Sequence, residues 1–491
     1  MEIILKGHEY KYAAEQSMLS LYPEERPVYP EVPGDGDLAE LELRRGKKYA
    51  VCICRLRRNG VKSRGEARVL QSILTDEVTE NRFLQRIVKQ AFFKAAIAGG
   101  HSVPVWGSLT GVRPGKLFMS LLSEGLSMKE AERRFEKEFA VSPKRVRLCA
   151  ESVAAALRAK ESLTERDVCL YIGIPFCPTR CAYCSFVSVE ATGAMKMLPE
   201  YLCAQEKELE AVAESIRAAG LRVVSVYIGG GTPTTLSAPQ LRRLCTRTRE
   251  IFDLSACREF TVEAGRPDTV TAEKMAALKD CGVTRVSVNP QTMSDAVLAA
   301  IGRHHTAADI YKAMELVRGA EAFEVNMDLI AGLPGDTPDQ FEETVKALIA
   351  MNPENITVHT LALKKGSRFL TEGTALPSGE EVGEMLERSE GLLRAAGYLP
   401  YYLYRQKFMS GSFENVGWTK PGKENLYNIC IMEELCGILS VGAGGSTKLV
   451  ENGSVDRLMA PKYPREYIQR IDSVCADKDG IVSFYERLLN H

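Results

Sequence analysis

The stretch that decides the fold runs from Val168 to Phe186 and reads VCLYIGIPFCPTRCAYCSF. Residues 168–174 form a short, almost wholly apolar run, which is typical of a buried strand in a parallel sheet. Three cysteines follow, at Cys177, Cys181 and Cys184. A buried strand that leads straight into such a loop would place it at the strand's carboxyl end, the edge at which βα barrels carry their chemistry.

Five further strand-like runs follow the first one, and helical segments separate them. The six predicted strands are residues 168–174, 222–228, 259–264, 285–288, 324–330 and 355–361. The predicted helices between them are residues 198–219, 239–252, 272–280, 307–319 and 338–350. Such alternation is the signature of repeated βα units around a parallel sheet. The sequence therefore predicts an α/β fold built on a partial (β/α)6 barrel.

The bulk properties are those of an ordinary globular protein. Hydrophobic residues make up 45% and charged residues 26% of the 491 residues, and the net charge is -1. No run of about 18 apolar residues and no secretory signal is visible, so we expect a cytoplasmic protein without a membrane partner. Residues 44–48 and 55–58 are basic, but a solvated surface explains them better than nucleic-acid binding, because no aromatic residues interleave for base stacking.

Most of the fourteen cysteines are expected to be free and structural, since a cytosolic chain rarely builds a disulfide framework. Cys52 and Cys54 would face the same side of a strand, where a buried face is favoured over a metal pair. Cys169 lies inside the first strand and is expected to be a buried thiol. Cys430 and Cys436 lie in an apolar helical stretch, and nothing near them in the sequence completes a metal ligand set.

The three loop cysteines are the exception. Their spacing lets one loop bind three irons of a cubane and leaves the fourth iron open. Structural zinc would want four ligands, and an electron-transfer cluster would want a fourth cysteine. An open iron can bind the amino and carboxylate groups of S-adenosylmethionine (SAM). The motif therefore predicts a radical SAM protein whose cofactors are a [4Fe–4S] cluster and SAM.

Polar and glycine residues follow the other strands and would meet at the same rim. The loop at residues 229–232 is GGGT, which lacks the spacing of a phosphate loop but would let backbone approach a small ligand. Glu263 and Asp328 could accept hydrogen bonds from ribose hydroxyls, Gln291 could donate and accept, and Arg303 could fork onto a carboxylate. Taken singly, Arg303 or Asp328 could equally form a rim salt bridge.

Over about residues 165–450 the sequence resembles the oxygen-independent coproporphyrinogen III oxidase family, and most of all its HemZ-like branch. The motifs that carry this resemblance lie at residues 171–184, 229–234, 282–287, 291–305 and 328–334. The resemblance implies that Tyr171, Gly230 and Glu263 contact the cluster-bound SAM. It implies a second SAM for members that resemble the true oxidase. The positions that match this second site are Tyr183, Gly231, Thr232, Gln291, Arg303, Asp328 and Ala362.

The resemblance also implies a reaction. The adenosyl radical would abstract hydrogen from a propionate of coproporphyrinogen III, and loss of carbon dioxide would leave a vinyl group; two such rounds give protoporphyrinogen IX in haem biosynthesis. The implied partners are an acidic tetrapyrrole and a low-potential electron donor such as flavodoxin or ferredoxin, and the protein is expected to be a monomer. The cations available for the substrate carboxylates are Arg303, Lys364, Lys365 and Arg405.

Two departures from the family pattern keep other functions open. Gly173 stands where the oxidases and their haem-handling relatives have histidine, and Phe186 stands where the oxidases carry a further cysteine. A missing imidazole and thiol would change proton delivery near the cofactor. One alternative is a haem-binding or haem-delivery protein, and another is a radical SAM methyltransferase or RNA-modifying enzyme. His304, His305 and His359 are expected to be hydrogen-bonded rim histidines rather than haem ligands.

Three domains are predicted. Residues 1–165 would form an α+β domain whose role the sequence does not indicate, residues 166–395 the barrel, and residues 396–491 a small HemN-like C-terminal domain. Residues 417–428 in the last domain are interpreted as a lid over the substrate. The aromatic residues at 398–404 could stack on a flat tetrapyrrole, although core packing is favoured for at least half of them.

Overall fold

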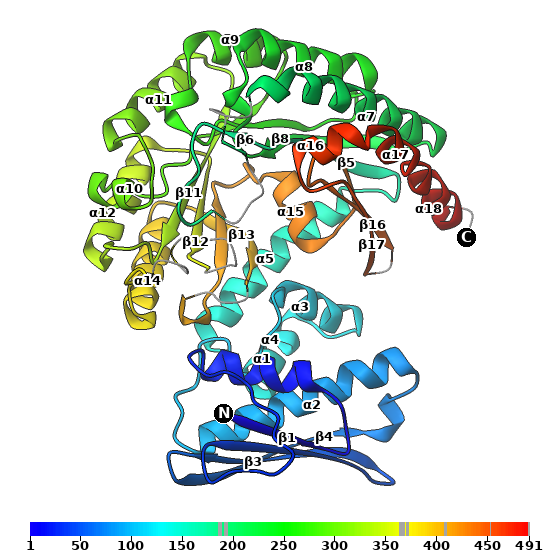
Figure 1. The fold of residues 1–491 in the computed structure, drawn as a ribbon, viewed down its shortest axis with the longest axis vertical. Helices are drawn as coiled ribbons and strands as arrows, with labels where there is room; N and C mark the ends of the chain where they lie inside the picture. The colour runs from blue at the N-terminus through cyan, green and yellow to red at the C-terminus, as the bar shows by residue number, and fades with distance from the viewer. Residues whose placement is uncertain are drawn as a thin grey trace. The chain divides into compact units, whose positions relative to one another are not determined.

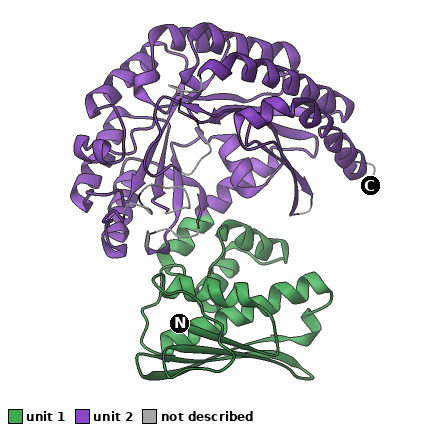
Figure 2. Cartoon of the chain, in the orientation of Figure 1, with its two compact units in different colours: residues 1–150, 405–408 green, residues 151–404, 409–491 purple. Residues whose placement is uncertain are grey.

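The computed structural model describes residues 1–184, 189–190, 195–362, 369, 373–406, 410–451 and 453–489. The chain divides into two compact units, residues 1–150 with 405–408 and residues 151–404 with 409–491 (Figure 2). The division falls inside helix α5 (Pro143–Glu161). The domain boundaries at residues 165 and 395 stay predictions. No helix in the described residues is both long enough and apolar enough to cross a membrane.

The first unit is built on a four-stranded sheet in the order β1-β2-β3-β4. Its strands are β1 (Glu2–Lys6), β2 (Leu38–Arg45), β3 (Tyr49–Arg58) and β4 (Val61–Leu70), and its helices are α1 (Lys11–Leu21), α2 (Glu77–Ala98), α3 (Pro114–Ser123) and α4 (Met128–Phe139). Helix α2 packs on β3 and β4. Cys52 and Cys54 are fully buried in the core beneath it, and burial raises the pKa of Cys52 to about 12. The buried-face prediction for these two thiols is confirmed.

The second unit is built on an eleven-stranded sheet. The strands in the middle of this sheet are the ones that the sequence predicted, so that prediction is confirmed. Six parallel strands stand side by side in sequence order. They are β5 (Asp167–Ile174), β8 (Arg222–Gly230), β9 (Glu259–Glu263), β10 (Arg285–Ser287), β11 (Glu324–Ala331) and β12 (Asn355–Thr360). Each begins and ends within two residues of its predicted range. Their carboxyl ends consequently share one rim.

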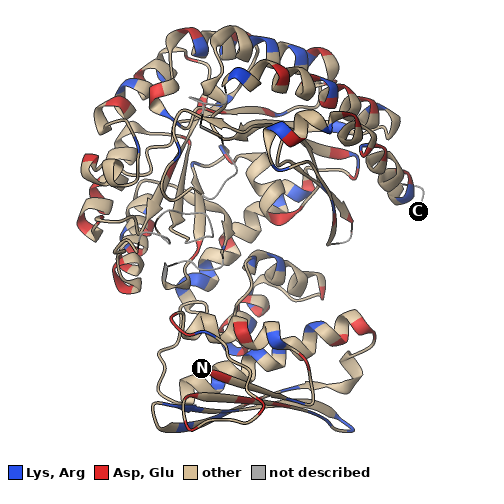
Figure 3. Cartoon of the chain, viewed as in Figure 1, with Lys and Arg blue, Asp and Glu red and all other residues tan. Residues whose placement is uncertain are grey.

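Helices connect these strands and lie along the outer arc of the unit (Figure 1). They are α7 (Leu198–Ala218), α8 (Ala238–Ile251), α9 (Ala272–Asp280), α10 (Asp295–Ala300), α11 (Ala307–Gly319), α12 (Pro338–Met351) and α14 (Gly379–Ala395). Capping boxes explain where several begin: Ser237 with Gln240 starts α8, and Ser378 with Glu381 starts α14. Basic and acidic residues are interspersed along these outer helices (Figure 3).

The C-terminal segment extends the same sheet at both edges. Strands β14 (Asn415–Thr419) and β13 (Leu399–Tyr404) continue it beyond β12. At the other edge, β15 (Gly437–Val441) pairs parallel with β5, and β16 (Ser446–Glu451) and β17 (Ser454–Met459) follow. The remaining helices of this segment are α15 (Leu426–Glu433), α16 (Pro464–Gln469), α17 (Ile471–Ala476) and α18 (Asp479–Leu489).

The lid prediction for residues 417–428 is wrong. Trp418 is 2% exposed and lies inside β14, paired on both sides. Tyr398, Tyr401 and Tyr402 are also buried, which confirms that core packing accounts for most of the aromatic residues in this segment. Strand β14 is buried at every position and paired on both edges, so it cannot open and close over a substrate.

Short elements complete the fold. Strands β6 (Phe176–Cys177) and β7 (Val189–Glu190) pair in parallel beside the cysteine loop. Single 3₁₀ turns are η1 (Gln71–Ile73), η2 (Met195–Met197), η3 (Pro233–Thr235), η4 (Pro267–Thr269) and η5 (Ser410–Ser412). Turns η3 and η4 directly follow the ends of β8 and β9, so two of the rim loops are held in tight, defined conformations.

Candidate functional site at the strand ends

The cysteine loop begins against the glycine loop that follows β8. The Gly231 amide donates to the Ile174 carbonyl at 2.8 Å, and the Thr232 amide donates to the Phe176 carbonyl at 2.8 Å. The Thr232 hydroxyl then donates to Cys177 Sγ at 3.5 Å. The end of β8 therefore fixes the backbone that leads to the first cysteine.

Glycine is required at this contact for steric reasons. A Cβ atom on Gly231 would lie 2.7 Å from the Phe176 carbonyl oxygen and 2.9 Å from that of Ile174. Gly230 has φ 111°, and a Cβ there would lie 3.2 Å from the Tyr171 hydroxyl. The loop thus brings bare backbone next to Tyr171, as the sequence predicted for the approach of a small ligand.

Arg266 holds the middle of the cysteine loop, a role that the sequence analysis missed. Its buried guanidinium donates to Cys181 Sγ at 3.4 Å and to Thr179 Oγ1 at 2.7 Å. A fixed cation beside a cysteine favours the thiolate, which is the form that binds iron. Arg266 comes shortly after the end of β9, and this position at the rim is the only signal in the sequence that could have found it.

Arg303 holds the far end of the loop. Its side chain is 8% exposed, and it donates to the Tyr183 hydroxyl at 3.0 Å and to the carbonyls of Gly265 and Asn289 at 3.1 Å each. Next to it, the Ala182 amide donates to the Ile301 carbonyl at 3.0 Å. Both terminal nitrogens of Arg303 are thus engaged within the protein. Arg303 Nε is buried and has no partner among the described residues, so one donor is not used by these contacts and the carboxylate fork stays a prediction.

The three cysteines lie half-buried on this clamped loop. The Cys184 amide donates to the Cys181 carbonyl at 3.1 Å, which turns the end of the loop back on itself. Three soft thiol donors on one short loop, with a cation beside the middle one, fit the ligand set of an iron–sulfur cluster. The residues that would hold the cluster are therefore Cys177, Cys181 and Cys184.

Glu263 and Tyr227 form the next wall of the site. Glu263 was predicted from the sequence, whereas Tyr227 was not. The Tyr227 hydroxyl donates to Glu263 Oε1 at 2.7 Å, and the Gly230 amide donates to Oε2 at 3.2 Å. Burial, with a smaller contribution from the Asp328 carboxylate, raises the pKa of Glu263 to about 7. Each carboxylate oxygen can accept a further hydrogen bond, so Glu263 suits the hydroxyl groups of a ribose.

Three tyrosine rings form the floor beneath this wall. Tyr171 stacks on Tyr227 with ring centroids 6.3 Å apart and on Tyr427 at 6.1 Å, and Tyr227 and Tyr427 lie 4.3 Å apart. Tyr171 comes from β5, Tyr227 from β8 and Tyr427 from α15. The stack fixes Tyr171 against the glycine loop. Tyr171, Gly230 and Glu263 therefore lie together and line one side of the candidate site, and we call these three residues the cradle.

Gln291 and Asp328 form the opposite side of the rim. The backbone amide of Gln291 donates to the backbone carbonyl of Asp328 at 3.0 Å, and the backbone amide of Ile330 donates to the backbone carbonyl of Gln291 at 3.0 Å. Gln291 has φ 70°, a strained conformation for a residue with a side chain, and strain of this kind gathers at functional sites.

Several buried polar atoms at this side have no hydrogen-bond partner among the described residues. They are Gln291 Oε1, Asn289 Oδ1 and Ser287 Oγ. Buried polar atoms without a partner are costly, so a set of them at one strand end indicates a polar ligand. Together with the cradle, these atoms fit a nucleoside-containing cofactor such as SAM.

The remaining predicted residues lie around this core. His359 Nε2 is 3.9 Å from Asp328 Oδ2, and its Nδ1 is 3.4 Å from the Tyr404 hydroxyl, which confirms a partnered rim histidine. Ala362 follows β12 and is half-buried. Burial lowers the pKa of His305 to about 4, and neither ring nitrogen has a partner in the described part of the chain. The prediction of a hydrogen-bonded His305 is therefore wrong.

The structure gives little support to the cationic side chains that were predicted to bind the substrate carboxylates. Arg405 belongs to the first unit, where it donates to the Leu109 carbonyl and lies over the Trp106 ring. It is 7% exposed and so is a packing residue. Lys364, Lys365 and Phe186 lie outside the described residues.

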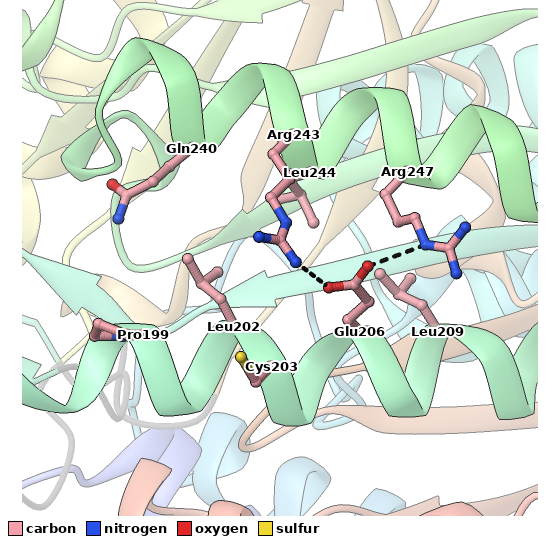
Figure 4. A pocket seen from close by; sticks show the side chains of 9 residues that line it. All are labelled: Pro199, Leu202, Cys203, Glu206, Leu209, Gln240, Arg243, Leu244 and Arg247. Carbon is pink, nitrogen blue, oxygen red and sulfur yellow. Dashed lines mark hydrogen bonds and ion pairs between the residues drawn. The ribbon is translucent and has the colours of Figure 1, made fainter.

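A separate hollow of about 210 Å³ lies on the outer helical layer between α7 and α8 (Figure 4). Glu206 crosses it and accepts from Arg243 at 2.8 Å and from Arg247 at 3.0 Å. Its lining contains none of the predicted site residues, so the strand-end rim remains the candidate site.

Comparison with known proteins agrees with this site. The sequence model of the Radical SAM superfamily matches residues 171–348, which include the cysteine loop. The oxygen-independent coproporphyrinogen-III oxidase-like protein HemZ of Bacillus subtilis (strain 168) is 37% identical over 380 residues, which is 76% of this chain and 76% of that protein. The heme chaperone HemW of Lactococcus lactis subsp. lactis (strain IL1403) is 34% identical over 283 residues, which is 56% of this chain and 68% of HemW.

A solved structure shares the fold. The coproporphyrinogen III oxidase HemN of Escherichia coli aligns with a TM-score of 0.52 and 23% identity, over 67% of this chain and 78% of that one. The predicted barrel is therefore a radical SAM fold. The cysteine loop, the glycine cradle and the similarity to HemZ over three quarters of the chain lead to one conclusion. The chain belongs to the radical SAM superfamily and, within it, to the family of oxygen-independent coproporphyrinogen III oxidase-like proteins.

Proposed function

We propose that this protein binds a [4Fe–4S] cluster through Cys177, Cys181 and Cys184 and oxidises the propionate side chains of coproporphyrinogen III. The observation that carries the proposal is the double attachment of the cysteine loop. Thr232 contacts its first cysteine and Arg266 its second, directly beside the Tyr171, Gly230 and Glu263 cradle. When bound, the cluster and SAM supply an electron and an adenosyl radical that removes hydrogen from the substrate.

The residues around the cofactors would position them and balance their charge. Glu263 accepts hydrogen bonds from ribose hydroxyls when it is ionised, and the Gly230 backbone lets the ligand approach closely. Arg266 and Arg303 place two buried cations next to the loop, which offsets the negative charge of a thiolate-bound cluster. The Tyr171 ring, fixed by its stack, bounds the site on the side of α15.

The substrate assignment rests on the relatives. HemZ is named as oxygen-independent coproporphyrinogen-III oxidase-like, and HemN as a coproporphyrinogen III oxidase. Each propionate-to-vinyl conversion would consume one SAM and release one CO2 and one electron, which an electron acceptor takes up, and two successive conversions would give protoporphyrinogen IX. A second SAM would lie against Tyr183, Gln291 and Asp328, where buried acceptors lack partners among the described residues. A flavodoxin or ferredoxin would supply the low-potential electrons.

The experiment is an anaerobic assay of the reconstituted protein. Dithionite, SAM and coproporphyrinogen III are added, and 5′-deoxyadenosine and protoporphyrinogen IX are followed together. The proposal predicts both products, their loss in Cys177→Ala, and their persistence in Cys203→Ala, which removes an exposed thiol on α7. Deoxyadenosine without tetrapyrrole conversion would refute the substrate and leave the radical chemistry in place.

Haem delivery is the second candidate, because HemW of L. lactis, a heme chaperone, is 34% identical over 56% of this chain. Arg303 keeps a buried Nε donor that has no partner among the described residues, and such a donor could meet a carboxylate of either haem or coproporphyrinogen III. A spectroscopic titration with haem separates the two candidates. Stoichiometric haem binding by protein that converts no coproporphyrinogen III would favour delivery.

A further inference from the structure

Three cysteines that are far apart in the sequence meet in the core of the second unit. The sulfurs of Cys169, Cys430 and Cys436 all lie within 4.8 Å of one another, and the sulfurs of Cys169 and Cys436 are 3.8 Å apart. Nothing near Cys430 and Cys436 in the sequence completes a ligand set, but the fold brings Cys169 beside them. The third thiol comes from a strand more than 250 residues earlier, and only the fold brings it near.

The sheet explains this convergence. Strand β15 pairs parallel with β5, so that Ile438 stands opposite Cys169 and Cys436 reaches the same place from just before the strand. Helix α15 packs against β8 and β13 and contributes Cys430. The three side chains are 0%, 0% and 6% exposed for Cys169, Cys430 and Cys436, respectively.

Their surroundings are apolar. Val224, Tyr427 and Ile438 belong to the same buried cluster. Among the described residues, no histidine, aspartate or glutamate joins the three thiols at comparable distance. The group is therefore a purely sulfur donor set, the kind that selects thiophilic metal ions over calcium or magnesium.

We propose that Cys169, Cys430 and Cys436 form a second metal site, distinct from the loop cysteines, for a single thiophilic divalent ion in planar three-thiolate coordination, which differs from the four-ligand geometry of an ordinary structural zinc site. A metal–sulfur bond of about 2.3 Å puts the sulfurs of a planar three-coordinate ion roughly 4.0 Å apart. One sulfur pair, at 3.8 Å, already matches this spacing, and the others need to contract by less than about 1 Å.

Charge favours a divalent ion over a monovalent one. Binding releases the three thiol protons, so three thiolates surround the ion. A divalent ion leaves one net negative charge in the core and a monovalent ion leaves two, and buried charge is costly. The alternative is that the thiols are simply small apolar core groups, which needs no metal.

The site would be structural. An ion there would tie α15 and β15 to β5, the strand that leads into the cysteine loop. Cys169 and Tyr171 are two residues apart on β5, and Tyr427 of α15 stacks on Tyr171. Metal occupancy would thus stabilise the floor of the cofactor cradle. This inference does not depend on the proposed substrate.

The test uses the full chain with Cys177, Cys181 and Cys184 changed to alanine, so that the loop binds no metal. The protein is purified anaerobically, stripped with a chelator and titrated with Cd²⁺, whose thiolate charge-transfer absorption reports sulfur ligation, and then with Zn²⁺ by elemental analysis. We expect the protein to bind one equivalent of metal ion, and we expect this binding to raise the Tm of the protein. Adding Cys430→Ala should abolish that equivalent, whereas adding Cys245→Ala, a buried thiol in α8, should not.

Cys436→Ser, which nearly preserves side-chain volume, is the second variant, and far-UV circular dichroism verifies that each variant is folded. The metal site is supported if the folded Cys436→Ser variant also fails to bind the one equivalent of metal ion. The proposal is overturned if the parent binds no Cd²⁺ or Zn²⁺. It is equally overturned if a folded Cys430→Ala or Cys436→Ser variant binds as much metal as the parent.

Discussion

At the scale of single residues, Glu263 is the titrating group of the site. Its carboxyl accepts from Tyr227 and from the Gly230 amide, yet burial raises its pKa to about 7. A raised carboxyl pKa means that the folded protein keeps a proton that the unfolded chain has lost. Its contribution to stability therefore falls as the pH rises from the ordinary carboxyl range to about 7.

SAM affinity should show the opposite trend, because the ionised carboxylate is the form that accepts from ribose hydroxyls. With the pKa of Glu263 at about 7, the ionised fraction falls about tenfold between pH 8 and pH 6, and the apparent affinity falls with it. We expect the Kd for SAM, measured by equilibrium dialysis on the reconstituted protein, to rise about tenfold over that range. Glu263→Gln should bind weakly at both pH values. A wild-type Kd that is flat with pH would contradict this role.

Arg266 gives a second prediction at this scale. Its replacement by glutamine removes a buried cation from Cys181 and Thr179. Hydrogen bonds of charged groups are worth about 1.5–3 kcal/mol, so iron should be lost from the reconstituted protein about 10-fold to 150-fold faster. Chelator-driven iron release measures this rate.

The matched control for Arg266 is Arg242→Gln, which removes an exposed arginine paired with Asp280. Its iron release should be that of the wild type. Equal rates in the Arg266 and Arg242 variants would show that the guanidinium at Cys181 does not hold the loop.

At the scale of elements, the account depends on the contact between the ends of β5 and β8. Gly231→Ala would force a Cβ against the Ile174 and Phe176 carbonyls, and overpacking of this kind costs about 1–3 kcal/mol. We expect the free energy of unfolding to fall by that amount in chemical denaturation. Gly319→Ala is the control, because a Cβ there meets nothing within 4 Å at the end of α11. If the Gly231→Ala and Gly319→Ala variants have the same free energy of unfolding, the close packing proposed for Gly231 is contradicted.

The elements also show what sequence can and cannot predict. The six barrel strands were predictable because each is a local apolar run that a helix-like segment follows, and local pattern suffices for that. Strand β14 was mistaken for a lid because its Gly417-Trp418 segment looks like a loop, and its pairing with β12 and β13 is long-range. Arg266 and Tyr227 were missed for the same reason: their partners are set by strand order.

At the scale of the whole molecule, one sheet joins the N-terminal and C-terminal parts of the second unit. Strand β15 lies beside β5, so residues after 430 complete the barrel edge at which the cysteine loop begins. The small C-terminal domain over residues 396–491 was predicted from the family resemblance, and the local sequence of this segment carries no information about which strands it pairs with. The first unit has its own core and its own four-stranded sheet.

The central claim is that three cysteines hold a cluster with one iron free for SAM, and the EPR spectrum of the reduced, reconstituted protein tests it most directly. The account predicts a four-iron signal that changes when SAM is added, and no such signal in Cys181→Ala. A signal that SAM leaves unchanged, or one that persists in Cys181→Ala, would contradict it.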